Sequence, residues 1–287
     1  MRHQIQGYNV RQRVNAMTID VEDYFQVSAF EKHIEYADWD SKELRVVRNV
    51  KRILDLLAKN DVKATFFVLG WIAKRCPEMV REIADAGHEI ASHGFNHTRV
   101  TQQEPKQFRD DVTSTKRLLE DTVGQEVIGY RAATYSIGET NLWALDVLAE
   151  TGHRYSSSIY PIKHDLYGMP RAPRFRFAVG ASKLTEIPIT TVAMFGRNWP
   201  CGGGGYFRLF PYALSRWALR HVNDVENQSA VFYFHPWEID ADQPRVEGLS
   251  LRTRIRHYLN LNRLEQRVAN LLRDFCWDRL DNVFCLR

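Results

Sequence analysis

The chain alternates between short apolar runs and longer amphipathic stretches, and this alternation constrains its fold more than any other feature. The apolar runs, rich in β-branched and aromatic residues, predict buried strands at Ala16–Val21, Lys63–Gly70, His88–Ser92, Val127–Arg131, Leu184–Pro188 and Ala230–His235. The amphipathic stretches predict helices at Leu44–Ala58, Pro77–Ala86, Pro105–Asp121, Glu139–Glu150 and Pro211–Val222. Strands that alternate with helices predict an α/β fold with a parallel sheet, either a barrel or a doubly wound sheet.

The charge balance argues against nucleic acid as a partner. The net charge is +4, from 39 basic and 35 acidic residues, which is too small an excess for a nucleic-acid-binding surface. Much of this excess lies near the C-terminus, where arginines recur from Arg245 to Arg279. We expect them to form a solvated helix face, with a surface for anionic glycans or lipid head groups as the alternative.

The sequence shows few features of a secreted or membrane-spanning protein. Its four cysteines are scattered, without a Cys-x-x-Cys pair, which favours reduced thiols over a disulfide framework. No apolar run is long enough to span a bilayer, and residues 1–15 lack the apolar core of a secretory signal. We therefore expect a cytoplasmic protein without a transmembrane segment, with peripheral attachment to the inner membrane as an option.

Ionisable residues gather where the predicted strands end. Four strand ends carry them: Asp20, Glu22 and Asp23; His93 and His97; Arg131 and Tyr135; His235 and Glu238. In parallel α/β architectures the carboxyl ends of the strands meet at one edge, where active sites form. The sequence therefore predicts one polar site assembled from four separate segments.

Two histidines within this set have the spacing of metal ligands. His93 and His97 are four residues apart, so on a helical turn their side chains would lie on one face and could share an ion. Such a pair also arises by chance in many helices. Combined with a carboxylate, it would leave open coordination positions for water and substrate, as a hydrolytic metal requires.

The carboxylates come from the segment Asp20-Val-Glu22-Asp23. Alternation along a strand points Asp20 and Glu22 to the same side, so one could bind the metal while the other accepts a proton from water. Asp23 replaces Glu22 as ligand if the strand has already turned. The alternative is an acidic loop or a helix cap without catalytic function.

In their order along the chain, these segments resemble the NodB-type polysaccharide deacetylases, carbohydrate esterase family 4. The resemblance runs from about Ala16 to Glu238 and rests on five motifs: Thr18-Ile-Asp-Val-Glu-Asp23, Ala64-Thr-Phe-Phe67, Ser92-His-Gly-Phe-Asn-His97, Arg131-Ala-Ala-Thr-Tyr135 and Phe234-His-Pro236. The ordered set is far more specific than any single motif. It implies a distorted (β/α) barrel of the NodB type with a C-terminal helical extension.

The resemblance also implies a role for each site residue. Asp20 would be the general base, steadied by Arg131, and His235 the general acid. The backbone N–H of Tyr135 would help to hold the oxyanion. A divalent metal ion, with Zn²⁺ as the family default, would be held by Glu22, His93 and His97, with Asp23 as the alternative ligand.

Two departures from the family pattern concern the geometry of this site. Ala133 stands where the usual motif has proline, which predicts a less rigid loop around the oxyanion donor. Glu22 replaces a shorter aspartate, so the position or the choice of the metal could differ.

The motifs Asp-Val-Glu-Asp-Tyr-Phe and His-Pro-Trp-Glu further resemble the subgroup tied to exopolysaccharide gene clusters of exosortase-bearing bacteria.

The expected organisation is an N-terminal extension over residues 1–15, a deacetylase domain over 16–240 and a C-terminal extension over 241–287 packed on it. The expected function is hydrolysis of N-acetyl groups on amino sugars of a bacterial exopolysaccharide or its precursor, by a metal-activated water. The substrate would be an acetylated amino-sugar polysaccharide or oligosaccharide. The alternatives are an allantoinase-like hydrolase of a cyclic amide or formamide, and a catalytically inactive carbohydrate-binding protein.

Overall fold

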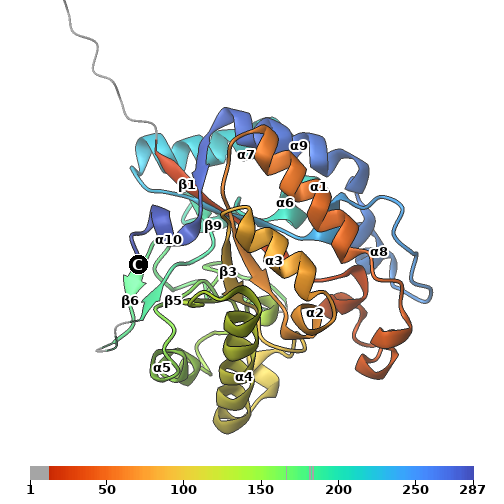
Figure 1. The fold of residues 1–287 in the computed structure, drawn as a ribbon. Helices are drawn as coiled ribbons and strands as arrows, with labels where there is room; N and C mark the ends of the chain where they lie inside the picture. Colours follow the sequence, from red (N-terminus) through yellow and green to blue (C-terminus); the bar gives the residue numbers. More distant parts are fainter. Residues whose placement is uncertain (1–12, 166, 181, 183) are drawn as a thin grey trace, which may run out of the picture.

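The fold is built on one predominantly parallel sheet, seen in a computed structural model that describes residues 13–165, 167–180, 182 and 184–287 (Figure 1). The strand order is β10-β1-β2-β3-β4-β5-β7-β6, and β11 also pairs with β1. The strands are β1 (Val14–Val21), β2 (Thr65–Val68), β3 (Glu89–Ser92), β4 (Gly129–Tyr130), β5 (Tyr155–Ser156), β6 (Phe177–Ala178), β7 (Thr185–Glu186), β10 (Val231–Phe234) and β11 (Cys276–Asp278). Within the described residues, the strands on this path pair in parallel except for β6 and β7, which are antiparallel. The sheet forms a half-barrel, which confirms the predicted α/β barrel architecture.

Helices flank the sheet on its outer side, with α1, α3 and α9 among those beside it in Figure 1. The helices are α1 (Val46–Lys59), α2 (Gly70–Arg75), α3 (Pro77–Asp85), α4 (Pro105–Val123), α5 (Trp143–Glu150), α6 (Gly204–Leu209), α7 (Tyr212–Arg220), α8 (Leu251–Tyr258), α9 (Leu261–Asp274) and α10 (Leu280–Val283). A separate hairpin consists of β8 (Thr191–Met194) and β9 (Arg197–Pro200). Each predicted strand and helix overlaps an observed one. No helix among the described residues is both long and apolar enough to cross a membrane.

Alternation along the strands separates two cores. Phe66 and Phe232 pack in the large core that includes the helices, whereas Phe67 and Tyr233 pack in a second core with Tyr155. This follows from the period of two along a strand, which turns successive side chains to opposite faces. The second core is rich in aromatic residues.

Residues before and after the predicted domain also contribute to this sheet. β1 begins at Val14, while residues 1–12 of the predicted N-terminal extension lie outside the described residues. Near the other end, β11 pairs with β1 in parallel, and α9 buries Leu264 and Val268 in the large core. The strand β1 therefore has hydrogen-bonded neighbours from both ends of the chain.

The register of the parallel strands brings the predicted site segments to one edge. Asp20 of β1 is opposite Phe67, Ser92 at the end of β3 is opposite Tyr130, and Ile19 is opposite Phe234. The residues that follow these positions therefore leave the sheet side by side. This geometry places Asp20, His93 and His235 around one cleft, with Arg131 buried behind it against Asp20.

A close contact inside the sheet gives a test of this packing. A Cβ atom on Gly129 of β4 would overlap the ring of Tyr155 on β5, whereas nothing lies within 4 Å of a Cβ on Gly138. Because a well-packed core resists added volume, we expect Gly129→Ala to lower the free energy of unfolding by about 1–3 kcal/mol. Denaturant unfolding measures the effect, with Gly138→Ala as the control. Equal stability of the two variants would contradict the described contact.

Candidate active site

A cleft of about 660 Å³ opens at the carboxyl ends of the strands. Its wall contains nearly all the predicted site residues: Asp20, Glu22, His93, His97, Tyr135 and His235. Asp20, Glu22 and His93 are each about 2% exposed. The cleft therefore combines several ionisable groups in a place largely screened from water, where charge interactions are strong.

Three of these residues form a group suited to a metal ion. Glu22, His93 and His97 each offer one ligand atom, and these atoms lie within 4.8 Å of one another. Nδ1–H of His93 donates a hydrogen bond of 2.8 Å to the carbonyl oxygen of Arg131. This bond leaves Nε2 of His93 as the free ligand nitrogen, as is usual for histidines that bind metals. Burial lowers the pKa of His93 to about 4, which keeps the ring neutral.

The two carboxylate oxygens of Glu22 differ in their hydrogen bonding: Oε1 has a partner and Oε2 has none among the described residues. Oε1 accepts a hydrogen bond of 3.1 Å from Nε1 of Trp237. Oε2 is buried without a hydrogen-bond partner among the described residues, although Nε2 of His97 lies 3.0 Å away. Burial opposes ionisation, but the neighbouring His97 and His235 hold the pKa of Glu22 well below its usual value. An unpaired carboxylate oxygen beside two imidazoles is a donor set that suits a divalent cation.

The two histidines share this site through a loop, so the expected helical turn is wrong. The segment from His93 to His97 is not helical, and both Gly94 (φ 74°) and His97 (φ 55°) have left-handed backbone conformations. The carbonyl of Gly94 accepts a hydrogen bond from the N–H of Gly70, and that of Phe95 accepts one from Trp71. These bonds hold the loop against the start of α2, so that the two imidazole centroids lie 5.3 Å apart.

Beside the metal group, Asp20 forms a buried ion pair with Arg131. Nη1 of Arg131 lies 2.6 Å from Oδ1 of Asp20, and the guanidinium is fully buried. The same guanidinium donates to the carbonyl and hydroxyl oxygens of Ser157 and lies 4.0 Å above the ring of Phe67. Burial disfavours the charged form of Arg131, but Asp20 outweighs it and raises the pKa. The pair holds one oxygen of Asp20 and leaves Oδ2 toward the cleft.

Tyr135 contacts Asp20 through its side chain. Its hydroxyl donates a hydrogen bond of 3.3 Å to Oδ2 of Asp20. Its backbone N–H donates to the carbonyl of Ala132 at 3.0 Å, within the turn of η5 (Ala133–Tyr135). This bond would have to open before the N–H could hold an oxyanion, so that role stays a prediction. The hydroxyl contact was not expected from the sequence.

His235 completes the opposite wall of the cleft. Its Nε2 lies 3.4 Å from Oε1 of Glu22 and 3.9 Å from Oδ2 of Asp20. Nδ1–H donates a hydrogen bond of 3.0 Å to Oε2 of Glu238, whose Oε1 accepts one of 2.8 Å from Nε of Arg208. Burial disfavours the charged ring, but the carboxylates of Glu22, Glu238 and Asp20 raise the pKa of His235 to about 9.

The supporting roles of Glu238 and Arg208 were missing from the sequence analysis. Glu238 is fully buried, and its pKa falls to about 2 because Arg208 and His235 outweigh the effect of burial. The sequence did contain a signal for Glu238, because it lies three residues after His235. In the structure these two residues form a capping box at the start of η7 (Pro236–Ile239). No pattern in the sequence pointed to Arg208, because it lies in α6, well before Glu238 in the chain.

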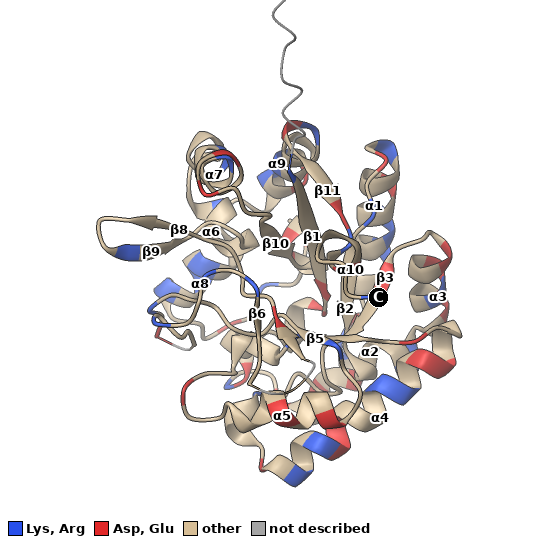
Figure 2. Ribbon diagram, turned by 90° about the vertical axis from the view of Figure 1, so that its left-hand side faces the viewer, with Lys and Arg blue, Asp and Glu red and all other residues tan. Residues whose placement is uncertain are grey.

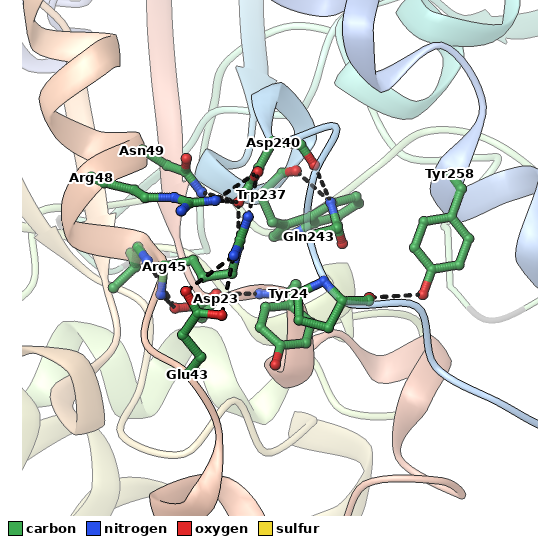
Figure 3. A network of polar contacts seen from close by, with 12 residues as sticks. Asp23, Tyr24, Glu43, Arg45, Arg48, Asn49, Trp237, Asp240, Gln243 and Tyr258 are labelled. Atoms are coloured by element: carbon green, nitrogen blue, oxygen red, sulfur yellow. Dashed lines mark hydrogen bonds and ion pairs between the residues drawn. The ribbon is translucent and has the colours of Figure 1, made fainter.

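Asp23 lies outside the metal group and serves a different network (Figure 3). Its carboxylate accepts hydrogen bonds from the backbone N–H groups of Tyr24, Arg45 and Val46, at 2.6–2.8 Å. The side chain of Arg45 in turn pairs with Asp240 at 2.7 Å. Burial raises the pKa of Asp23 to about 6. The arrangement is that of a helix cap, the alternative considered for this acidic segment.

The glycine run Gly202–Gly205 permits close packing through its first three members. A Cβ on Gly202 would lie 2.5 Å from the carbonyl oxygen of Val231. A Cβ on Gly203 would overlap the ring of Tyr233, and one on Gly204 would overlap the carboxylate of Glu238. The glycines thus let α6 approach β10 closely, and only Gly205 lines the cleft.

Two regions of the chain match known protein families. Residues 34–156 match the family described as polysaccharide deacetylase, and residues 157–285 match a domain of unknown function, DUF3473. The first match contains His93, His97, Arg131 and Tyr135. Asp20 and Glu22 precede it, and His235 lies in the second match. The cleft is therefore assembled from both matched regions and the segment before them.

Curated relatives match the chain in part. It is 34% identical over 97 residues to a chitooligosaccharide deacetylase of Bradyrhizobium sp. (strain ANU 289). This aligned segment covers 34% of the chain and 42% of the relative. It is 36% identical over 73 residues to a peptidoglycan-N-acetylglucosamine deacetylase of Bacillus cereus, which covers 25% of the chain and 26% of the relative. The chain thus spans less than half the length of these relatives.

Solved structures share the fold at low sequence identity. A Mycobacterium smegmatis protein assigned to the polysaccharide deacetylases superposes with a TM-score of 0.62 at 22% identity, covering 96% of the chain and 90% of that protein. A peptidoglycan N-acetylglucosamine deacetylase gives 0.51 at 16% identity, covering 96% and 90%. The chain therefore contains a region that matches the polysaccharide deacetylases, the family that its motifs resemble, followed by a region that matches DUF3473.

Proposed function

We propose that the protein is a metal-dependent N-deacetylase that removes acetyl groups from amino sugars of a polysaccharide. One observation carries this proposal: Asp20 and His235 flank the Glu22, His93 and His97 group within one buried cleft. Amide hydrolysis needs a base, an acid and an electrophile around one carbon atom, and this arrangement offers all three. The polymer is a bacterial exopolysaccharide or its precursor, a choice that rests on the motif resemblance.

Glu22, His93 and His97 would hold a divalent ion, and two imidazoles with one carboxylate suit Zn²⁺. Such an ion supplies Lewis acidity, which lowers the pKa of water and polarises the amide carbonyl. Asp20 accepts the proton of the attacking water at Oδ2, because Arg131 occupies Oδ1. His235 then donates the proton on Nε2 to the departing amine, and Glu238 stabilises the ring while it is charged.

The acid and the base can be tested directly. We expect Asp20→Asn and His235→Ala each to lower kcat for acetate release from an acetylated glycan by about 10²–10⁴-fold, the usual contribution of a positioned acid or base. Asp242→Asn, at an exposed site, is the control and should keep full activity. Wild-type rates in either cleft variant would contradict the assignment. A wild-type protein that binds metal but releases no acetate from any glycan would favour the inactive binding protein instead.

The ligand set can be tested by metal content. We expect the purified protein to bind a divalent ion, and Zn²⁺ to raise its Tm because the ion binds only the folded chain. Glu22→Gln and His97→Ala should lose most of the metal and of this Tm increase. Asp23→Asn should retain the metal, although it weakens a helix cap. Elemental analysis and thermal unfolding check both points. Metal loss in Asp23→Asn with retention in Glu22→Gln would reverse the ligand assignment.

The support of His235 by Glu238 predicts a change in the pH profile. A general acid acts in its protonated form, so kcat/KM should fall as the pH rises through the pKa of His235, raised to about 9. Glu238→Gln removes a negative charge that favours the protonated ring. The alkaline limb should then move to lower pH by about 1 unit or more. A bound cation would move the alkaline limbs of both the wild type and Glu238→Gln to lower pH. It would leave the sign of the difference between them unchanged.

The control for this measurement is Glu247→Gln, which removes a carboxylate at an exposed position and should leave the alkaline limb in place. An alkaline limb that is unmoved, or that moves to higher pH, in Glu238→Gln would contradict the role of Glu238.

A further inference from the structure

A second cavity of about 740 Å³ adjoins the catalytic cleft. The two share part of their walls, and the residues that line both include Tyr167, Gly205, Arg208, Tyr233, Arg252 and Arg256. A ligand with its reacting group at Asp20 and His235 could therefore continue into this second cavity. All the residues in this shared wall lie within the DUF3473 match.

Beyond the shared wall the cavity becomes aliphatic. Leu209 of α6 and Leu251, Ile255 and Leu259 of the α8 region line it together with Tyr206. Leu251 is 71% exposed, Leu209 52% and Ile255 48%. Three large exposed aliphatic side chains around one concave surface are characteristic of a binding site for apolar ligands. Leucine and isoleucine offer no partner for sugar hydroxyls, so this part of the wall suits a hydrocarbon better than a glycan.

Two arginines lie between the catalytic groups and this aliphatic wall. Arg252 and Arg256 line both cavities, and Figure 2 shows basic residues along α8. Both guanidinium groups pair with the single carboxylate of Asp165, at 3.0 and 3.2 Å. Two positive charges against one negative charge leave a net positive charge. An anionic group of a ligand would complement this position, since guanidinium groups bind phosphate oxygens well.

We propose that the second cavity binds the aglycone of an amphiphilic substrate: a hydrocarbon chain joined to the amino sugar through a phosphate-type anion. The sugar would occupy the catalytic cleft, the anion would lie at Arg252 and Arg256, and the chain would lie along Leu209, Leu251 and Ile255. This assignment rests on the proposed deacetylase function, and it names the class of substrate that the cleft and cavity would hold together.

The test uses dodecyl phosphate below its critical micelle concentration, with inorganic phosphate and dodecyl maltoside as probes for the head and the tail alone. We expect the full chain to bind dodecyl phosphate at least about tenfold more tightly than either probe. The double variant Leu251→Ser/Ile255→Ser should weaken this binding about tenfold or more, because it removes apolar contact area. Arg252→Gln/Arg256→Gln should instead abolish the preference for dodecyl phosphate over dodecyl maltoside. Isothermal titration calorimetry measures each affinity.

Matched controls are available on the same surface and elsewhere. Arg254→Gln removes a charge from α8 at a residue outside both cavity walls, and Val47→Ser removes an aliphatic side chain of similar exposure (43%) from α1. Both should bind like the wild type. Far-UV circular dichroism and thermal unfolding check that every variant is folded.

The outcomes separate this proposal from the proposed function. Acetate release from an N-acetylated oligosaccharide by the wild type, without binding of dodecyl phosphate, would overturn the aglycone site and leave the deacetylase function standing. Equal weakening of oligosaccharide and dodecyl phosphate binding in the aliphatic variant would make the cavity a glycan subsite and also overturn it. Binding of dodecyl phosphate without acetate release from any acetylated glycan would overturn the proposed function and the aglycone assignment with it.

Discussion

The site depends on the buried ion pair between Arg131 and Asp20. A fully buried guanidinium is costly to desolvate, and its cost is offset here by Asp20, by the hydroxyl of Thr18 and by both oxygens of Ser157. The backbone carbonyl of the same arginine orients His93. Arg131 thus fixes the proposed base through its side chain and a proposed metal ligand through its main chain. Loss of one partner from such a pair typically costs about 3–5 kcal/mol, since a buried charge remains.

The region that matches the domain of unknown function contributes residues to the candidate active site. Its strand β10 pairs with β1, which places His235 beside Asp20 and Glu22. It also supplies Trp237, which orients Glu22, and Arg208, which supports Glu238. The deacetylase and DUF3473 matches therefore meet within one sheet. A division into residues 16–240 and a packed extension over 241–287 remains a proposal, with β11 and α9 joined closely to β1 and the large core.

Much of the fold could be predicted from the sequence, because burial imposes a period on each element. Phe66 and Phe67 belong to opposite cores, and their run of apolar residues is typical of a strand buried on both faces. The grouping of Asp20, His93, Arg131 and His235 followed from the rule that parallel strands end at one edge. The helical turn from His93 to His97 was wrong because a left-handed Gly94 ends the regular backbone, and the loop is held by contacts with α2 that periodicity does not encode.

The remaining parts of the site arise from contacts between distant segments. Arg208 reaches Glu238 only because three glycines bring α6 against β10, and the aliphatic wall of the second cavity combines α6 with α8. No local pattern specifies such pairs. The choice between Glu22 and Asp23 as ligand was equally open from the sequence, because it depends on where β1 turns. In the structure, Asp23 is engaged by three backbone N–H groups.

The central claim is that a metal ion binds between Glu22, His93 and His97 while Asp20 stays free as the base. Anomalous diffraction at the zinc absorption edge, from crystals grown with Zn²⁺, tests it most directly. We predict a single strong peak in the cleft within coordination distance of Oε2 of Glu22 and of Nε2 of His93 and His97, with Arg131 still paired to Asp20. A peak coordinated by Asp20 or Asp23, or no peak in this cleft, would contradict it.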